Sequence, residues 1–329
     1  MLMEQDVAYS GTNGKTIAYI ICTISKALEL KSPGKSSPTA IIVLPSRELA
    51  VYVHELYCSI LPGGLTYYLC IGGTAVRSQM KEAKEADIVI GTAGRILDMV
   101  NRATLKVSAT SILVLDEVNT LLVKKDTLYD IFQKLPTSVQ VIATSPFFPP
   151  ATLSTFTHFL KTKPISDGLP LAHLSIKHYE VSLSETDKLD ASIEIISRNN
   201  VKTIVYVNTR RKVDWLCEQL RNASISSLSC LHGDIDQNTR QLTLSEFKQK
   251  ERWVLVTCGT MLHGLKFNGI RLVILFDEPS PEDAIRATGL LPQDGSKGSL
   301  LSMHLSETWK DHPNAVPAIP LPADVSGIF

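Results

Sequence analysis

Short apolar runs alternate along this chain with longer stretches in which apolar residues recur at helical spacing. The short runs, rich in Ile, Val and Leu, predict buried β-strands, and the longer stretches predict amphipathic helices. In the first half we expect strands at 40–44, 67–71, 88–90, 111–115 and 140–143, and helices at 16–29, 47–60, 78–84 and 126–134. This alternation predicts a parallel sheet with helices on both faces.

A segment that contains prolines and a glycine, 161–170, interrupts the alternation as a linker would. After it we expect strands at 176–181, 203–207, 253–257 and 272–276, and helices at 212–221 and 237–248. The layout predicts two α/β domains, 1–163 and 176–304, joined by a linker at 164–175. The proline-rich tail, 305–329, has no clear periodicity, which predicts partial disorder.

Length and composition restrict the class of protein. The 329 residues allow two ordinary domains, although a single α/β barrel would fit the length too. A content of 44% hydrophobic and 20% charged residues is typical of a globular chain. No apolar run reaches the ~20 residues of a membrane span, and residues 1–6 lack the features of a secretory signal. We therefore expect an intracellular, cytoplasmic protein with no membrane contact.

Charge and cysteine content add two further restrictions. The chain has 33 basic and 33 acidic side chains, so nucleic-acid binding must come from a local surface and not from net charge. The six cysteines show no C-x-x-C spacing, which argues against a zinc site or a thioredoxin-like motif. We expect free, buried thiols at Cys22, Cys58, Cys70, Cys217, Cys230 and Cys258.

Two carboxylates, Asp116 and Glu117, stand at the end of the apolar run 111–115. A buried strand that ends in two carboxylates is how phosphate-loop ATPases present Mg²⁺ and the attacking water. By itself this pattern is weak evidence, because a helix cap or a turn just past a strand also uses acidic residues. Whether it indicates an ATPase depends on the other motifs in the chain.

Upstream, Gly14-Lys15-Thr16 begins a predicted helix. A helix start in this pattern would aim backbone N–H groups and the Lys15 ammonium at phosphates, with the Thr16 hydroxyl on Mg²⁺. The pattern is incomplete, because Tyr9 stands where phosphate-loop spacing calls for glycine.

Further short motifs keep a fixed order around these two. They are Pro45 to Ala50, Thr92 to Arg95, Asn208 to Trp215 and His232 to Asp234. Chance produces several motifs in order far more rarely than any one of them. Over residues 10–298 the chain resembles the core of a DEAD-box RNA helicase. The resemblance implies two RecA-like domains in tandem, each a mostly parallel sheet flanked by helices, with ATP and Mg²⁺ as cofactors and RNA as partner.

The resemblance also implies roles for single residues in the first domain. Nucleotide contacts would come from Gly11, Thr12, Asn13, Gly14, Lys15 and Thr16. Thr16 and Asp116 would hold Mg²⁺, and Glu117 would polarise the attacking water. Two motifs depart from the family: Val118-Asn119 replaces Ala-Asp, and Ser145-Pro146-Phe147 replaces Ser-Ala-Thr. The family's adenine-reading glutamine segment is not found upstream of Gly14.

The second domain departs further from the family on its nucleotide-facing side. Lys266 stands where the resemblance expects a carboxylate that binds ribose. Leu290 and Gln293 stand at the two arginine-finger positions, and both are uncharged. Such a finger contributes roughly 10³–10⁵ in rate, about 4–7 kcal/mol of transition-state stabilisation.

The positions that would contact RNA keep the family pattern. By resemblance they are Arg47, Gly73, Thr92, Gly94 and Arg95 in the first domain, and Asn208, Arg211, Arg240 and Thr257 in the second. Such residues contact phosphates and sugars and not base edges, so the implied recognition is independent of RNA sequence.

Three functions fit these observations. The favoured one is a degenerate DEAD-box-like protein that binds the RNA backbone and Mg-ATP, with hydrolysis weak or absent. The alternatives are an active ATP-dependent RNA helicase and a non-catalytic scaffold for protein partners in a ribonucleoprotein complex. In its eroded motifs the chain resembles most the helicase-like modules of tudor-domain proteins of the piRNA pathway, which would place it in RNA granules.

Overall fold

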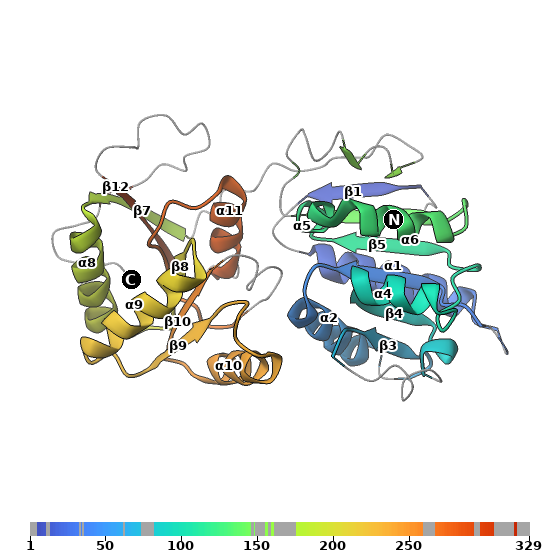
Figure 1. The fold of residues 1–329 in the computed structure, drawn as a ribbon, viewed down its shortest axis with the longest axis horizontal. Helices are drawn as coiled ribbons and strands as arrows, with labels where there is room; N and C mark the ends of the chain where they lie inside the picture. Colours follow the sequence, from blue (N-terminus) through green and yellow to red (C-terminus); the bar gives the residue numbers. More distant parts are fainter. Residues whose placement is uncertain are drawn as a thin grey trace. The chain divides into compact units, whose positions relative to one another are not determined.

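The computed structural model describes residues 5–10, 14–32, 34, 36–61, 63–73, 82–145, 148, 155–156, 159–160, 176–258, 267–292, 297–305 and 319–320. The chain divides into two compact units, Met1–Leu171 and Ala172–Phe329, each with its own sheet (Figure 1). The predicted linker, 164–175, and nearly all of the predicted tail lie outside the described residues.

The first unit has a six-stranded sheet with strand order β1-β6-β5-β2-β4-β3, and every pair of neighbours is parallel. The strands are β1 (Val7–Ser10), β2 (Ala40–Leu44), β3 (Tyr67–Cys70), β4 (Ile88–Thr92), β5 (Ile112–Asp116) and β6 (Gln140–Ser145). The helices are α1 (Lys15–Glu29), α2 (Arg47–Ile60), α4 (Ala93–Asn101), α5 (Val118–Leu121) and α6 (Lys125–Lys134), with a 3₁₀ turn at Leu122–Lys124.

Alternate residues of one strand serve two hydrophobic cores in this unit. Ile41 of β2 belongs to a cluster with Ile96 of α4 and residues of α6, whereas Ile42 belongs to a cluster with Tyr19 of α1 and residues of α2. Strands buried on both faces have near-continuous apolar sequences, which is why β2 is recognisable from its sequence.

The second unit has a seven-stranded sheet with strand order β13-β7-β12-β11-β8-β10-β9, again parallel throughout. The strands are β7 (Ile176–Leu183), β8 (Thr203–Val207), β9 (Leu228–Leu231), β10 (Val254–Cys258), β11 (Leu272–Leu275), β12 (Gly298–Leu305) and β13 (Ile319–Pro320). The helices are α8 (Glu185–Asn199), α9 (Arg210–Asn222), α10 (Gln237–Gln249) and α11 (Pro281–Leu290). The two sheets confirm the predicted pair of RecA-like α/β domains.

Helix starts in both units follow from their sequences. Five helices begin with a side chain that accepts a hydrogen bond from a backbone N–H group of the first turn. These side chains are Ser46, Ser184, Thr209, Asp236 and Ser280. Such caps satisfy N–H groups that have no partner within the helix. They fix where α2, α8, α9, α10 and α11 begin.

The prediction of free thiols was wrong for two of the six cysteines. Cys217 of α9 and Cys230 of β9 are joined as a disulfide, with their Cα atoms 6.5 Å apart. Their spacing of 13 residues gives no local sequence pattern, and the packing of α9 on β9 brings them together. Cys22, Cys70 and Cys258 are free and buried as predicted, whereas Cys58 is free and exposed.

No helix in the described part of the chain is long and apolar enough to cross a membrane.

Candidate nucleotide and RNA sites

The first candidate site lies where neighbouring strands of the first sheet end. Strands β1, β6 and β5 are adjacent, and α1 follows β1 along the chain. In the register of β5 and β6, Asp116 is paired with Thr144. Because all of these strands are parallel, their carboxyl ends meet at one edge of the sheet, which is where ligands bind in open α/β sheets.

Asp116 is the centre of a buried hydrogen-bond network. Its Oδ1 accepts bonds from the Thr144 hydroxyl at 2.5 Å and from the Glu117 backbone N–H at 3.0 Å, and its Oδ2 accepts one from the Tyr19 hydroxyl at 3.0 Å. Burial raises the pKa of Asp116 above its usual value, and the charge of Glu117 adds to this, while Lys15 and the two hydroxyls oppose it. The network fixes the orientation of the carboxylate.

Lys15 and Glu117 face each other at the same edge. The Lys15 Nζ lies 3.6 Å from the Glu117 Oε1, and only 8% and 3% of the two side chains are exposed. Glu117 has a φ of 57° and a ψ of 50°, in the left-handed region. A non-glycine residue there costs roughly 1–3 kcal/mol, and such residues cluster at functional sites.

Gly14 precedes α1 with a φ of 79°, a conformation that glycine adopts without a steric penalty. The turn at Gly14 makes Lys15 the first residue of the helix, and Thr16 follows half-buried. Gly11, Thr12 and Asn13, also predicted to bind phosphates, lie outside the described residues.

The chemistry of these donors fits Mg-ATP. Hydroxyl and carboxylate oxygens are the ligands that Mg²⁺ prefers, and Thr16 and Asp116 supply them. The N-terminus of α1 and the Lys15 ammonium offer positive charge for phosphates.

Predicted RNA contacts in the first unit lie at the starts of two helices. Arg47, the first residue of α2, packs against Gly72 and Gly73: a Cβ at Gly72 would lie 3.0 Å from the Arg47 Nη2. These glycines leave room for the guanidinium. Thr92 precedes α4, and Gly94 is exposed within its first turn.

Arg95, also in α4, is mostly buried. Its side chain is 12% exposed, and its Nη1 lies 3.7 Å from the Asp98 Oδ2. Any contact of Arg95 with phosphate would therefore compete with a carboxylate on the same helix.

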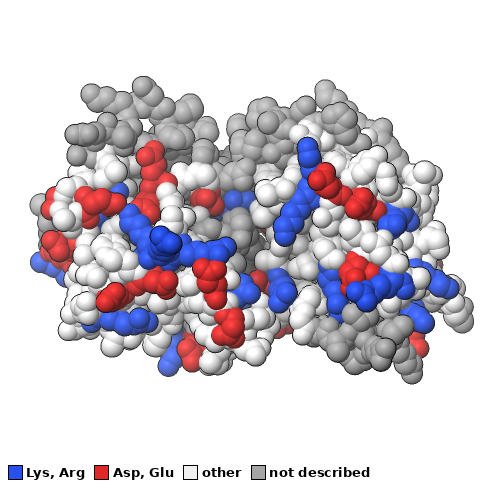
Figure 2. All heavy atoms as spheres, in the orientation of Figure 1, with Lys and Arg blue, Asp and Glu red and all other residues white. Residues whose placement is uncertain are grey.

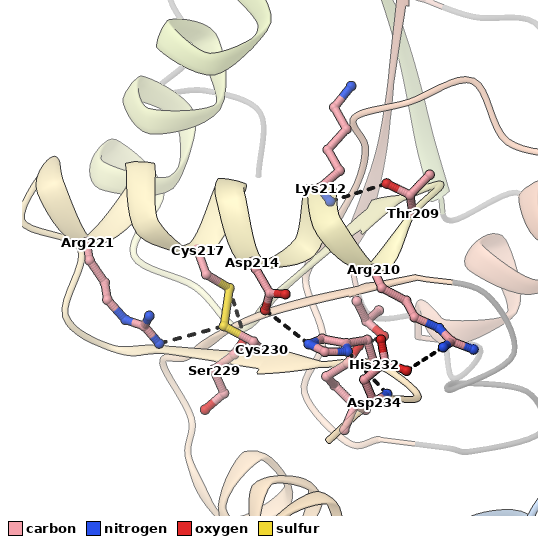
Figure 3. Close-up of polar contacts among 12 residues, drawn as sticks. Thr209, Arg210, Lys212, Asp214, Cys217, Arg221, Ser229, Cys230, His232 and Asp234 are labelled. Carbon is pink, nitrogen blue, oxygen red and sulfur yellow. Dashed lines mark hydrogen bonds and ion pairs between the residues drawn. A yellow bond between two sulfur atoms is a disulfide. The ribbon is translucent and has the colours of Figure 1, made fainter. Parts of the chain in front are cut away.

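Figure 3 shows polar side chains of α9, of β9 and of the loop after β9, next in sequence to the predicted RNA contacts Asn208 and Arg211. Arg210 forms an ion pair with Asp234, and the His232 Nε2 lies 3.0 Å from the Asp214 Oδ1. Arg211 is exposed, and among the described residues it has no hydrogen bond or ion pair. It is available to a phosphate.

The other predicted contacts of this unit have internal partners. The Asn208 amide donates to the Glu278 carbonyl at 2.9 Å, and the Arg240 Nη2 donates to the Gln237 Oε1 at 2.6 Å. Thr257 is fully buried, and its hydroxyl donates to the Leu231 carbonyl at 2.9 Å. Thr257 therefore positions β10 against β9, and any role toward RNA has to pass through its neighbours.

Basic and acidic side chains lie beside one another on the face drawn in Figure 2, in both units. This mixture accords with the zero net charge of the chain. The substituted positions Lys266 and Gln293 lie outside the described residues, while Leu290 is the half-buried last residue of α11.

Sequence reasoning did not identify two partners of Asp116, namely Tyr19 and Thr144. Tyr19 lies one helical turn after Lys15, a spacing that places both side chains on one face of α1. Thr144 is found only from the register of β5 and β6.

Comparison with known proteins gives two family matches along the chain. The model of the DEAD/DEAH box helicase family matches residues 6–156, and that of the helicase conserved C-terminal domain matches residues 187–289. Eukaryotic initiation factor 4A of Zea mays is 34% identical over 303 residues, which cover 88% of this chain and 72% of that protein. The ATP-dependent RNA helicase eIF4A of Sclerotinia sclerotiorum is 33% identical over 310 residues, which cover 91% of this chain and 76% of that protein.

Solved structures show the same fold. S. cerevisiae Dbp5 bound to RNA and ADP BeF3 matches with a TM-score of 0.82 at 23% identity, covering 92% of this chain and 80% of that one. Mss116p bound to ssRNA and AMP-PNP matches with a TM-score of 0.82 at 23% identity, covering 92% of this chain and 66% of that one.

Proposed function

This chain belongs to the DEAD-box RNA helicase family, and on that basis we propose that it binds the RNA backbone and Mg-ATP while hydrolysing ATP slowly or not at all. The proposal rests on a contrast between the two units. In the buried site of the first unit, Lys15 pairs with Glu117, and the Glu117 N–H donates to Asp116. In the second unit, the arginine-finger position on α11 holds the apolar Leu290.

The first unit would bind nucleotide with its own residues. A phosphate at the N-terminus of α1 would compete with Glu117 for the Lys15 ammonium, because both are anions. Lys15 would then neutralise phosphate charge, and Glu117 would be free to orient water. Mg²⁺, held by Thr16 and Asp116, would supply charge stabilisation to the phosphates.

The second unit would contribute little to the reaction. The transferring phosphoryl group develops charge that a cation from the second domain normally stabilises. Neither Leu290 nor Gln293 carries charge. RNA binding would then need neither turnover nor bound ATP, a role that suits a component of a cytoplasmic ribonucleoprotein complex.

An active helicase is the second candidate, and the completeness of the Asp116 network favours it. The two candidates share ligands and differ in turnover. A scaffold that binds neither ligand is the remaining outcome.

A mant-ATP titration beside an RNA filter-binding assay tests the proposal. Lys15→Ala should weaken mant-ATP binding and leave RNA affinity within about twofold, because its partner Glu117 faces the nucleotide site. Arg95→Ala with Arg211→Ala should weaken RNA binding by about tenfold or more, since two phosphate contacts are lost. Equal loss of RNA binding in both variants at one salt concentration would contradict the proposal.

Two controls make this result interpretable. Arg198→Ala with Arg252→Ala removes two other exposed arginines of the second unit and should leave RNA binding unchanged at the same salt concentration. Arg211→Ala alone tests an exposed side chain, so its effect cannot come from the burial of Arg95. Wild-type protein that binds neither mant-ATP nor RNA would leave only the scaffold.

A further inference from the structure

Tyr19 takes part in the Asp116 network from inside the core of the first unit. It lies on α1, its side chain is fully buried, and its hydroxyl donates to the Asp116 Oδ2 at 3.0 Å. Burial, followed by the charge of Asp116, raises the pKa of Tyr19. The hydroxyl of Tyr19 thus interacts with one of the two residues assigned to Mg²⁺.

Counting the acceptor sites of Asp116 shows what this contact does. An ionised carboxylate offers about four lone-pair sites, two on each oxygen. The Thr144 hydroxyl and the Glu117 N–H occupy the two sites of Oδ1, and the Tyr19 hydroxyl occupies one site of Oδ2. One site on Oδ2 therefore remains for a metal ion or a water molecule bound to it.

We propose that Tyr19 is a positioning residue for Mg²⁺, whose hydroxyl holds the Asp116 carboxylate in place and directs its remaining acceptor site to the ion. The inference rests on the proposed function, since it assumes that the first unit binds Mg-ATP. Groups that orient metal ligands in this way typically change metal affinity by about 10–100-fold when they are removed. A phenylalanine would fill the same core and leave the carboxylate without this donor.

A purely structural role for Tyr19 is the competing explanation, and Tyr57 provides a matched control. Tyr57 of α2 is also fully buried in the same hydrophobic cluster. Its hydroxyl lies 2.6 Å from the Thr23 Oγ1, and among the described residues it makes no hydrogen bond to Asp116. Tyr57→Phe therefore removes a buried hydroxyl and its hydrogen bond while leaving the Asp116 network in place.

The experiment measures mant-ATP affinity of the full chain in EDTA and across a Mg²⁺ titration. For Tyr19→Phe we expect the Mg²⁺ concentration at half-maximal enhancement to rise by about tenfold, with affinity in EDTA within twofold of wild type. Tyr57→Phe should keep the wild-type Mg²⁺ requirement. Circular dichroism and the thermal unfolding midpoint should show both variants folded, since a loss of packing alone would affect the two alike.

Four results would overturn the inference. In Tyr19→Phe, the Mg²⁺ concentration at half-maximal enhancement could stay unchanged, or it could fall. It could also rise equally in both variants, or Tyr19→Phe could fail to fold while Tyr57→Phe folds. In each case wild-type protein still binds Mg-ATP, so the proposed function stands. Wild-type protein without Mg²⁺-dependent binding of mant-ATP would instead overturn the ATP-binding part of the proposed function, and this inference with it.

Discussion

The ion pair between Lys15 and Glu117 in the first unit leaves 8% and 3% of its side chains exposed, whereas the pair between Arg210 and Asp234 in the second unit leaves 59% and 63% exposed. Lys15 of the first pair is a proposed phosphate contact, and Arg210 of the second pair precedes Arg211, a proposed RNA contact. Solvent screens the exposed pair, and little screens the buried one.

The difference accords with the proposed function. If the first unit binds nucleotide, charges that are fixed before the ligand arrives would favour the reaction, and the buried Asp116 beside this pair accepts bonds from two hydroxyls and an N–H group. If the second unit binds the RNA backbone, its cations have to be reachable, and Arg210 and Arg211 of α9 are exposed. In the second unit a covalent link between Cys217 and Cys230 holds α9 to β9.

The largest expected effect concerns turnover. With saturating single-stranded RNA, we expect wild-type ATPase near background, about 10³–10⁵ below a family member that has both finger arginines. Glu117→Gln should then change the rate little, because a positioned water is of no use without a cation for the phosphoryl charge. A phosphate-release assay measures both.

The converse variant sharpens this test. Leu290→Arg with Gln293→Arg should raise turnover only in part, since Lys266 and the segment after Ser145 also depart from the family. Wild-type turnover on the order of 1 s⁻¹ that disappears in Glu117→Gln would establish the active helicase instead.

The next effect concerns the buried pair itself. Lys15→Ala leaves Glu117 buried without its cation, and breaking a buried pair in this way typically costs about 3–5 kcal/mol. Urea unfolding followed by far-ultraviolet circular dichroism measures the loss. All three tryptophans, Trp215, Trp253 and Trp309, lie in the second unit, so their fluorescence should stay unchanged through the early transition.

A double variant separates the pair from the packing of its side chains. Lys15→Met with Glu117→Gln removes both charges and should recover part of the stability lost in Lys15→Ala. No recovery, or a loss below 1 kcal/mol in the single variant, would mean that water screens this pair as it does the exposed one.

Most of the fold could be predicted because the central strands are buried on both faces. Their continuous apolar runs, as in β2 and β8, need no knowledge of neighbours. Strands β1, β9, β12 and β13 were not predicted, because they are short or lack this pattern. Ser229 and Cys230 interrupt the edge strand β9, and serines and a histidine interrupt β12. Their burial depends on what packs against them, which the local sequence does not contain.

In the candidate site, too, local motifs predict some residues, whereas others depend on tertiary packing. Lys15, Asp116 and Glu117 could be predicted because short local motifs place each of them at the end of an element. The partners that fix Asp116 could not, because Thr144 depends on strand register and Tyr19 on how α1 packs against β5. The pairing of Cys217 with Cys230 likewise exists only after α9 has packed on β9.

The covalent link in the second unit gives the third expected effect. Closing a loop of this length stabilises a fold by on the order of 3 kcal/mol, mainly by restricting the unfolded chain. Dithiothreitol should therefore lower the urea midpoint seen by tryptophan fluorescence, and Cys217→Ser with Cys230→Ser should show the lower midpoint without reductant. Cys58→Ser, which removes an exposed free thiol of the first unit, is the control. A midpoint that reductant does not move in wild-type protein would show that the pair is reduced in solution.

The smallest effect concerns the exposed pair. Asp234→Asn breaks the ion pair with Arg210 and should change the stability of the second unit by only about 0.2–1 kcal/mol, because both side chains are well solvated. Glu194→Gln, which breaks a similarly exposed pair with Arg198 on α8, should give a change of the same size in the tryptophan-monitored urea midpoint. RNA affinity should separate the two variants: Asp234→Asn frees Arg210 and removes a negative charge beside it, so binding at low salt should tighten, whereas Glu194→Gln should leave it unchanged. A stability loss above 2 kcal/mol in Asp234→Asn, or weaker RNA binding, would mean that this pair holds the loop after β9 in place, and the contrast between a buried and a solvated ion pair would no longer hold.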